Sequence, residues 1–175
     1  METSTLAKET PATLRRTISV LVENKFGVLA RISTLFAARA FNIDSLAVGE
    51  TEDPSVSRMT IVVSGNENVL EQVEKQLNKL IDVIQVTSYV DGTHIERDLA
   101  LIKVKADKSS RHEIFQIVDI FRAKVVDVSP DTLVIEVTGD ESKITALEDL
   151  LKPFGIQEMV RTGIIAMARG SNKKK

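Results

Sequence analysis

Two short polar segments carry residue types that could bind a small ligand. The first, Asn24-Lys25-Phe26-Gly27, interrupts an alternating apolar run and precedes an apolar run with helical spacing. Gly27 has no side chain, so the backbone can approach a ligand there. The free N–H groups that open a helix at about Val28 form an electropositive cup suited to a carboxylate. The Asn24 amide can both donate and accept hydrogen bonds.

The second segment is the bend at Asn42-Ile43, which again sets an asparagine amide beside aliphatic side chains. The turn and the bend together offer donors for a carboxylate, carbonyl oxygens for an ammonium group and an apolar wall. This combination predicts an amino-acid site. The matching turn in the second half of the chain, residues 107–111, has no glycine and is charged or hydroxylated, so we expect it to pack, pair or dock instead.

The elements that position these segments follow from hydrophobic periodicity. Alternating apolar residues predict strands at 14–23, 43–50, 56–64 and 83–90. Helical spacing predicts a helix at 28–40, in which Val28, Leu29, Ile32, Leu35 and Phe36 share one stripe, and another that begins at Gly65-Asn66. The predicted order is βαββαβ, the split βαβ arrangement of ferredoxin-like folds.

The second half of the chain repeats this order. Strands are expected at 99–106, 124–129, 132–138 and 162–168, with helices at 111–121 and from Asp140 onward. A polar link, residues 91–98, joins the two halves. The predicted fold class is therefore α+β, with two ferredoxin-like βαββαβ domains at 14–91 and 92–170. We expect residues 1–13 to be a disordered leader and 171–175 a frayed tail.

Composition excludes several classes of partner. The 175 residues carry a net charge of −2, which gives no general attraction to nucleic acid or to an anionic membrane. No apolar run approaches the roughly 20 residues that span a bilayer. The absence of cysteine excludes disulfides and thiolate metal sites and fits a reducing compartment. The leader is polar and does not resemble a signal or transit peptide.

Catalytic and metal chemistry also lack the residues they need. The imidazoles are His94, expected in the link, and His112, expected at a helix start, and we predict both to be exposed. Strand 57–64 has no aromatic side chain on which an RNA base could stack. Residues 50–53 are acidic, but four consecutive residues on a hairpin tip cannot converge on a metal ion, so we interpret them as a solvated turn. We expect no catalytic residue, no metal site and no cofactor in this chain.

The sequence closely resembles the small, regulatory subunit of acetolactate synthase, also called acetohydroxyacid synthase. The segments that carry the resemblance are residues 15–24, 27–31, 42–46, 53–54, 57–61, 72–77, 94–97, 120–122, 126–128, 161–164 and 168–170. They extend over nearly everything from Arg15 to Gly170. The resemblance implies an N-terminal ACT domain, a regulatory amino-acid-binding fold, followed by the C-terminal domain typical of this subunit.

The resemblance also implies a function in the biosynthesis of valine, leucine and isoleucine. In that family a separate large subunit is the catalyst and holds thiamine diphosphate, magnesium and FAD, while the small subunit activates it and confers feedback inhibition by valine. The implied valine site takes Asn24, Gly27, Val28 and Leu29 from one protomer and Asn42 and Ile43 from its mate in an ACT homodimer. The implied location is the cytoplasm, or the plastid stroma if the protein is organellar.

Two alternatives remain at this point. The chain could be a free-standing ACT-type sensor of another amino acid that acts on a different enzyme. It could also be an enzyme in its own right, which would require the chain alone to turn over pyruvate. The first is the stronger alternative, because the sequence supplies no catalytic constellation.

Overall fold

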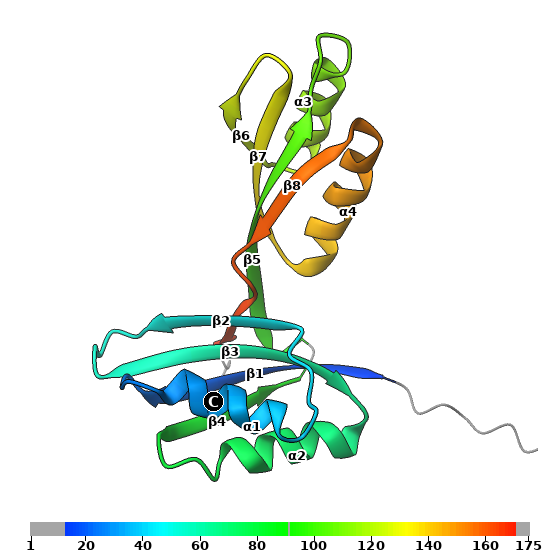
Figure 1. The fold of residues 1–175 in the computed structure, drawn as a ribbon. Coiled ribbons are helices and arrows are strands. Elements are labelled where there is room, and N and C mark those ends of the chain that lie inside the picture. Colours follow the sequence, from blue (N-terminus) through cyan, green and yellow to red (C-terminus); the bar gives the residue numbers. More distant parts are fainter. Residues whose placement is uncertain (1–12, 91, 171–175) are drawn as a thin grey trace, which may run out of the picture. The chain divides into compact units, whose positions relative to one another are not determined.

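The computed structural model describes residues 13–90 and 92–170. The predictions for the leader, apart from Thr13, and for the tail at 171–175 concern residues outside these ranges. The described chain divides into two compact units, one of residues 13–44 and 49–88 and one of residues 45–48 and 89–170. Figure 1 shows the elements of each unit.

The first βαββαβ unit has the predicted order, although residues 45–48 of its second strand cluster with the second compact unit. Its elements are β1 (Leu14–Glu23), α1 (Val28–Ala37), β2 (Ser45–Glu50), β3 (Val56–Gly65), α2 (Glu67–Leu77) and β4 (Val83–Tyr89). The strands form one sheet in the order β2-β3-β1-β4, so β2 lies at an edge. The two helices lie on the same face of this sheet (Figure 1).

Alternation along the two central strands creates the core of this unit. β1 and β3 are antiparallel, with Ile18 opposite Ile61 and Val20 opposite Met59. These side chains point to the face that the helices cover, and the residues next to them in sequence point to the opposite face. The side chains that complete the core from the helices are Val28, Ile32, Leu35 and Phe36 of α1 and Leu70, Val73 and Leu77 of α2.

The first helix is shorter than predicted. It ends at Ala37, and the chain then turns through Ala40, whose φ of 54° lies in the left-handed region. That conformation cannot continue a right-handed helix. Leu29, predicted on the apolar stripe, is 45% exposed, while the other four stripe residues are buried.

The second unit also contains a βαββαβ sequence of elements. These are β5 (His94–Lys105), α3 (Arg111–Ile120), β6 (Lys124–Val128), β7 (Thr132–Gly139), α4 (Glu141–Leu151) and β8 (Ile156–Arg161), with a short 3-10 helix η1 (Lys152–Phe154) before β8. The sheet order is β6-β7-β5-β8. Both helices cover one face of this sheet (Figure 1).

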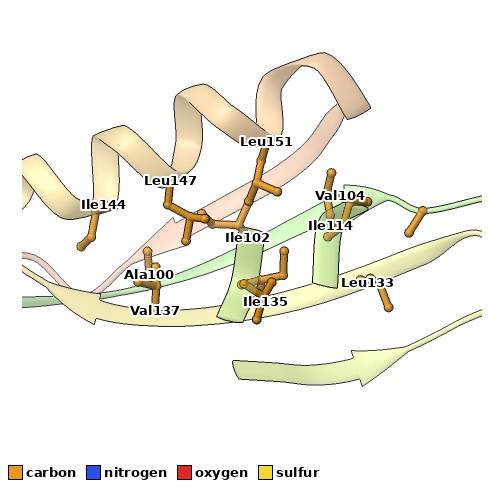
Figure 2. Close-up of a cluster of buried hydrophobic side chains, with 12 residues drawn as sticks. Ala100, Ile102, Val104, Ile114, Leu133, Ile135, Val137, Ile144, Leu147 and Leu151 are labelled. Carbon is orange, nitrogen blue, oxygen red and sulfur yellow. The ribbon is translucent and has the colours of Figure 1, made fainter. Parts of the chain in front are cut away.

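The core of the second unit lies between α3, α4 and the central strands (Figure 2). Every second residue of β5 and β7 points toward the helices, as a strand requires. The labelled side chains in this layer are Ala100, Ile102 and Val104 of β5, Leu133, Ile135 and Val137 of β7, Ile114 of α3, and Ile144, Leu147 and Leu151 of α4.

The predicted last strand at 162–168 is wrong. The strand that completes the second sheet is β8, which begins directly after Gly155, a glycine at φ 94° that ends η1. A separate short strand, β9 (Ile165–Ala168), follows Gly163 and pairs with residues 94–97. The polar link predicted at 91–98 is therefore also wrong in its second half, because β5 already begins at His94. Both differences arise because residues 94–97 pair with residues 165–168, about 70 residues away in the chain.

Candidate functional site

The turn between β1 and α1 is open, as the sequence predicts. Gly27 is the N-cap of α1, with φ 83° and ψ −3°. It provides no side-chain cap, and a Cβ built on it would have nothing within 4 Å. Only a glycine adopts this left-handed conformation at little cost. The space next to Gly27 is therefore accessible to a small ligand.

Backbone donors face this space. The Val28 N–H makes one long bond, 3.4 Å, to the Lys25 carbonyl oxygen. The N–H groups of Leu29 and Ala30 have no acceptor among the described residues. Donors of this kind, at the positive end of a helix dipole, favour a carboxylate. The side chain of Val28 is buried, so only its backbone is available to a ligand, whereas the side chain of Leu29 is 45% exposed.

Asn24 lies beside the tip of the β2–β3 hairpin. Its Nδ2 donates to Glu50 Oε1 at 3.0 Å and to the Pro54 carbonyl oxygen at 2.9 Å. Its backbone N–H donates to the Ser55 carbonyl oxygen at 2.7 Å. Three hydrogen bonds thus hold Asn24 against the hairpin. We call the space bordered by Gly27 and the N–H groups of Leu29 and Ala30 the Gly27 cup.

Asn42 and Ile43 follow the other end of α1. The Asn42 Nδ2 donates to Asp44 Oδ1 at 2.8 Å, and Ile43 is half-buried. The ten residues of α1, at 1.5 Å each, separate its two ends by about 15 Å. One chain therefore does not bring Asn42 and Ile43 to the Gly27 cup.

The matching turn of the second unit is filled by its own carboxylate. Asp107 Oδ1 accepts from the N–H groups of Ser109 at 2.9 Å and Ser110 at 2.8 Å. It also accepts from their hydroxyls, at 2.7 and 2.9 Å. These bonds, with the Ser109 hydroxyl first, hold the pKa of Asp107 well below its usual value. This turn therefore contains a carboxylate of the chain itself, directly before α3.

The two histidines differ from each other. His112 is exposed on α3, as predicted. His94 is not, because only 9% of its side chain is exposed. Its ring stacks on Tyr89 with centroids 4.8 Å apart, and its Nε2 lies 2.9 Å from Glu96 Oε1. The exposure predicted for His94 is therefore wrong, since the residue lies in a strand rather than in a link.

Other kinds of site receive no support from the described ranges. Within residues 13–90 and 92–170, no three His, Asp or Glu side chains come together as metal ligands. None of the helices in the same part of the chain is long and apolar enough to cross a membrane. Glu50, interpreted from the sequence as part of a solvated turn, is exposed and also accepts a hydrogen bond from Asn24. The sequence carries no local signal for that contact, because 26 residues separate the two.

This chain is similar to known proteins over most of its length. Residues 18–85 match the model of the AHAS small subunit-like ACT domain, and residues 97–170 match that of the small subunit of acetolactate synthase. The acetolactate synthase small subunit of Aquifex aeolicus is 58% identical over 153 residues, which cover 87% of this chain and 80% of that protein. The one of Mycobacterium bovis is 53% identical over 154 residues, covering 88% and 92%.

A solved structure extends this similarity to three dimensions. The crystal structure of the acetolactate synthase small subunit from Thermotoga maritima superposes with a TM-score of 0.84 at 45% identity. The match covers 90% of this chain and 99% of that one. The chain therefore belongs to the family of acetolactate synthase small subunits, and its first βαββαβ unit is an ACT domain.

Proposed function

We propose that this chain is the regulatory subunit of an acetolactate synthase in branched-chain amino-acid biosynthesis. It activates a separate catalytic subunit and confers feedback inhibition by valine. The observation that carries the proposal is the open, uncapped turn at Gly27 in an ACT domain. The backbone N–H groups at the start of α1 can bind a carboxylate there. The chain is non-catalytic by itself and acts in the cytoplasm, or in the stroma if organellar.

The proposed effector site is shared by two protomers. Asn24, Gly27, Val28 and Leu29 come from one, and Asn42 and Ile43 from its two-fold mate. The distance of about 15 Å between the ends of α1 supports this sharing, because one chain cannot close both ends around a valine. A two-fold axis makes the arrangement reciprocal, so a dimer has two equivalent sites.

The chemistry belongs to the catalytic subunit. Thiamine diphosphate, magnesium and FAD are bound there, and this chain contributes no group to the condensation of pyruvate. Valine can regulate only by binding one arrangement of the dimer better than another. In our proposal, valine tightens the ACT pair, which reorients the second units against the catalytic subunit and reverses activation.

Reconstitution with a catalytic subunit tests this function. Acetolactate formation is measured for the catalytic subunit alone, with the chain added, and with the chain and L-valine. We expect the chain to raise the rate and valine to reverse that rise. A rate that does not respond to the chain would contradict the role of activator, and activation that valine leaves unchanged would contradict the role of valine sensor.

The alternative is a free-standing sensor of another amino acid that acts on a different enzyme. The open turn suits the carboxylate and ammonium groups that all amino acids share. It therefore does not distinguish valine from other amino acids, and the alternative remains. A thermal-shift screen of valine, serine, threonine and phenylalanine separates the two. Stabilisation by valine supports our proposal, and stabilisation by one of the others alone supports the alternative.

A further inference from the structure

The orientation of the Asn24 amide is determined by its two neighbours. Glu50 Oε1 and the Pro54 carbonyl oxygen lie 3.0 and 2.9 Å from its Nδ2. An ionised carboxylate and a carbonyl can only accept hydrogen bonds, and only the nitrogen end of a carboxamide donates. The amide nitrogen must therefore face the hairpin, and its oxygen must point away from it.

This orientation gives Asn24 a defined role toward a ligand. Both of its amide hydrogens are used, and its Oδ1 has no donor among the described residues. A ligand that meets the side chain must bring a donor of its own. The N–H groups of Leu29 and Ala30 supply the opposite polarity for a carboxylate. The turn therefore suits a molecule with both a carboxylate and an ammonium group.

The hairpin does not need Glu50 to keep its shape. The Thr51 N–H donates to the Val56 carbonyl oxygen at 3.0 Å, and the Val56 N–H to that of Asp53 at 2.9 Å. The Ser55 N–H and hydroxyl both donate to Asp53 Oδ1. Because these bonds close the turn by themselves, the contact of Glu50 with Asn24 fixes the amide rather than the hairpin.

We propose that Glu50 is a positioning residue of the effector site, which holds Asn24 as an acceptor so that the site takes 2-amino acids and rejects the corresponding 2-oxo acids. Its carboxylate also adds negative charge next to the position of the ammonium group. The proposal rests on the function proposed above. It matters for a biosynthetic sensor, because a 2-oxo acid with the same side chain differs from valine at this group alone.

Calorimetric titration of the full chain tests the proposal, with L-valine and 3-methyl-2-oxobutanoate as ligands. We expect native protein to bind valine and to bind the 2-oxo acid at least about tenfold more weakly, as for one lost hydrogen bond to a charged group. Glu50→Ala should lose at least about tenfold in valine affinity and most of the discrimination. Glu50→Gln, which keeps an acceptor oxygen, should retain most of both.

Glu52→Ala serves as the matched control, because Glu52 is a carboxylate on the same hairpin whose side chain has no partner in the described structure. It should bind both ligands like native protein. Thermal unfolding of each variant shows whether the hairpin or the fold is damaged. Equal binding of the two ligands by native protein would overturn the proposal, as would native affinity in Glu50→Ala.

Failure of the proposed function has a separate signature. Native protein would then bind no valine, with or without the catalytic subunit, and the proposal for Glu50 would fail with it. Valine binding by native protein together with unchanged binding by Glu50→Ala would instead overturn the role of Glu50 alone.

Discussion

At the scale of single residues, the difference between the two βαββαβ units is a carboxylate. The turn before α3 binds the Asp107 carboxylate of the chain itself, whereas the turn before α1 has Gly27 and open space. The N–H groups that the Asp107 carboxylate accepts from belong to Ser109 and Ser110, directly before α3. In our proposal, the carboxylate at the Gly27 turn comes from an amino acid.

Replacing Gly27 with aspartate should abolish valine binding while activation of the catalytic subunit is retained. The new carboxylate would occupy the position of the ligand's carboxylate and repel it. Non-glycine residues at φ 83° cost roughly 1 to 2 kcal/mol, so strain must be controlled. Calorimetry with valine and the reconstituted rate assay measure the two effects.

Two variants separate charge from strain in this test. Gly27→Asn has a similar size and tolerance of the left-handed region but no charge, so it should still bind valine measurably. Gly92→Asp introduces the same residue at φ 80°, also with nothing within 4 Å, and should bind valine like native protein. Native affinity in Gly27→Asp would show that the turn is not the site.

The Asp107 carboxylate predicts a pH dependence of stability. Its folded-state pKa lies below the value of 3.8 expected when unfolded. The ionised carboxylate therefore stabilises the fold above pH 3.8, and this contribution is lost as the pH falls through the folded pKa. Asp107→Asn should be less stable than native protein at pH 7, and the difference should shrink below pH 3.8.

Chemical denaturation at several pH values measures this difference. Asp119→Asn is the control, since Asp119 is exposed on α3 and its side chain has no partner in the described part of the chain. A difference between native protein and Asp107→Asn that stays constant from pH 7 to pH 3 would contradict the assignment.

At the scale of elements, a buried ion pair joins the middle of β5 to the end of β8. Only 1% of the Asp98 side chain is exposed, and its Oδ2 accepts from Arg161 Nε at 2.6 Å. The Thr162 hydroxyl donates to the other carboxylate oxygen at 3.0 Å. Both oxygens of the buried Asp98 carboxylate are thus hydrogen-bonded, while one third of the Arg161 side chain is exposed.

Asp98→Ala should lower the free energy of unfolding by about 1.5 to 3 kcal/mol, because it removes the hydrogen bonds of Arg161 and Thr162 to a buried carboxylate. Glu148→Ala removes a surface pair with Lys152 and should cost less than about 1 kcal/mol. Denaturation followed by circular dichroism compares the two. Equal losses of free energy of unfolding in the two variants would show that the Asp98 pair stabilises the fold no more than a surface pair does.

The sequence predicted those elements whose signals are local. β1 has the predicted bounds, Leu14–Glu23, because alternation and the Asn24–Gly27 turn both mark it. The prediction from sequence was wrong where a segment distant in the chain determines the structure. β9 pairs with residues 94–97, and Arg161 and Thr162, 63 and 64 residues away, bind the buried Asp98. A sequence pattern treats polar residues as exposed and contains no such partners.

The candidate site shows the same division. The strand, turn and helix start around Gly27 follow from the local sequence, and the structure contains an uncapped turn there. Which end of the Asn24 amide faces the hairpin depends on Glu50 and Pro54, which lie 26 and 30 residues away in the chain. Local periodicity cannot specify a hydrogen bond across that separation.

At the scale of the whole molecule, the proposed effector site requires a dimer. β2 is an edge strand, and such edges leave backbone groups free to pair with another chain. Because the proposed site takes residues from both protomers, valine should bind the dimer and not the monomer. Its binding must then stabilise the dimer by linkage.

Saturating valine should therefore lower the dissociation constant of the homodimer by at least about tenfold. Sedimentation equilibrium with and without valine measures this shift, and Gly27→Asp, which should not respond, is the control. A dimer whose affinity stays the same while valine is bound would contradict a shared site.

A calorimetric titration of native protein with L-valine tests the central claim most directly. We predict saturation near one valine per ACT domain, with an affinity in the micromolar to sub-millimolar range, since eight heavy atoms contribute roughly 5 to 7 kcal/mol. Gly27→Asp should give no binding heat. Absence of binding by native protein, both alone and with the catalytic subunit, would contradict the claim.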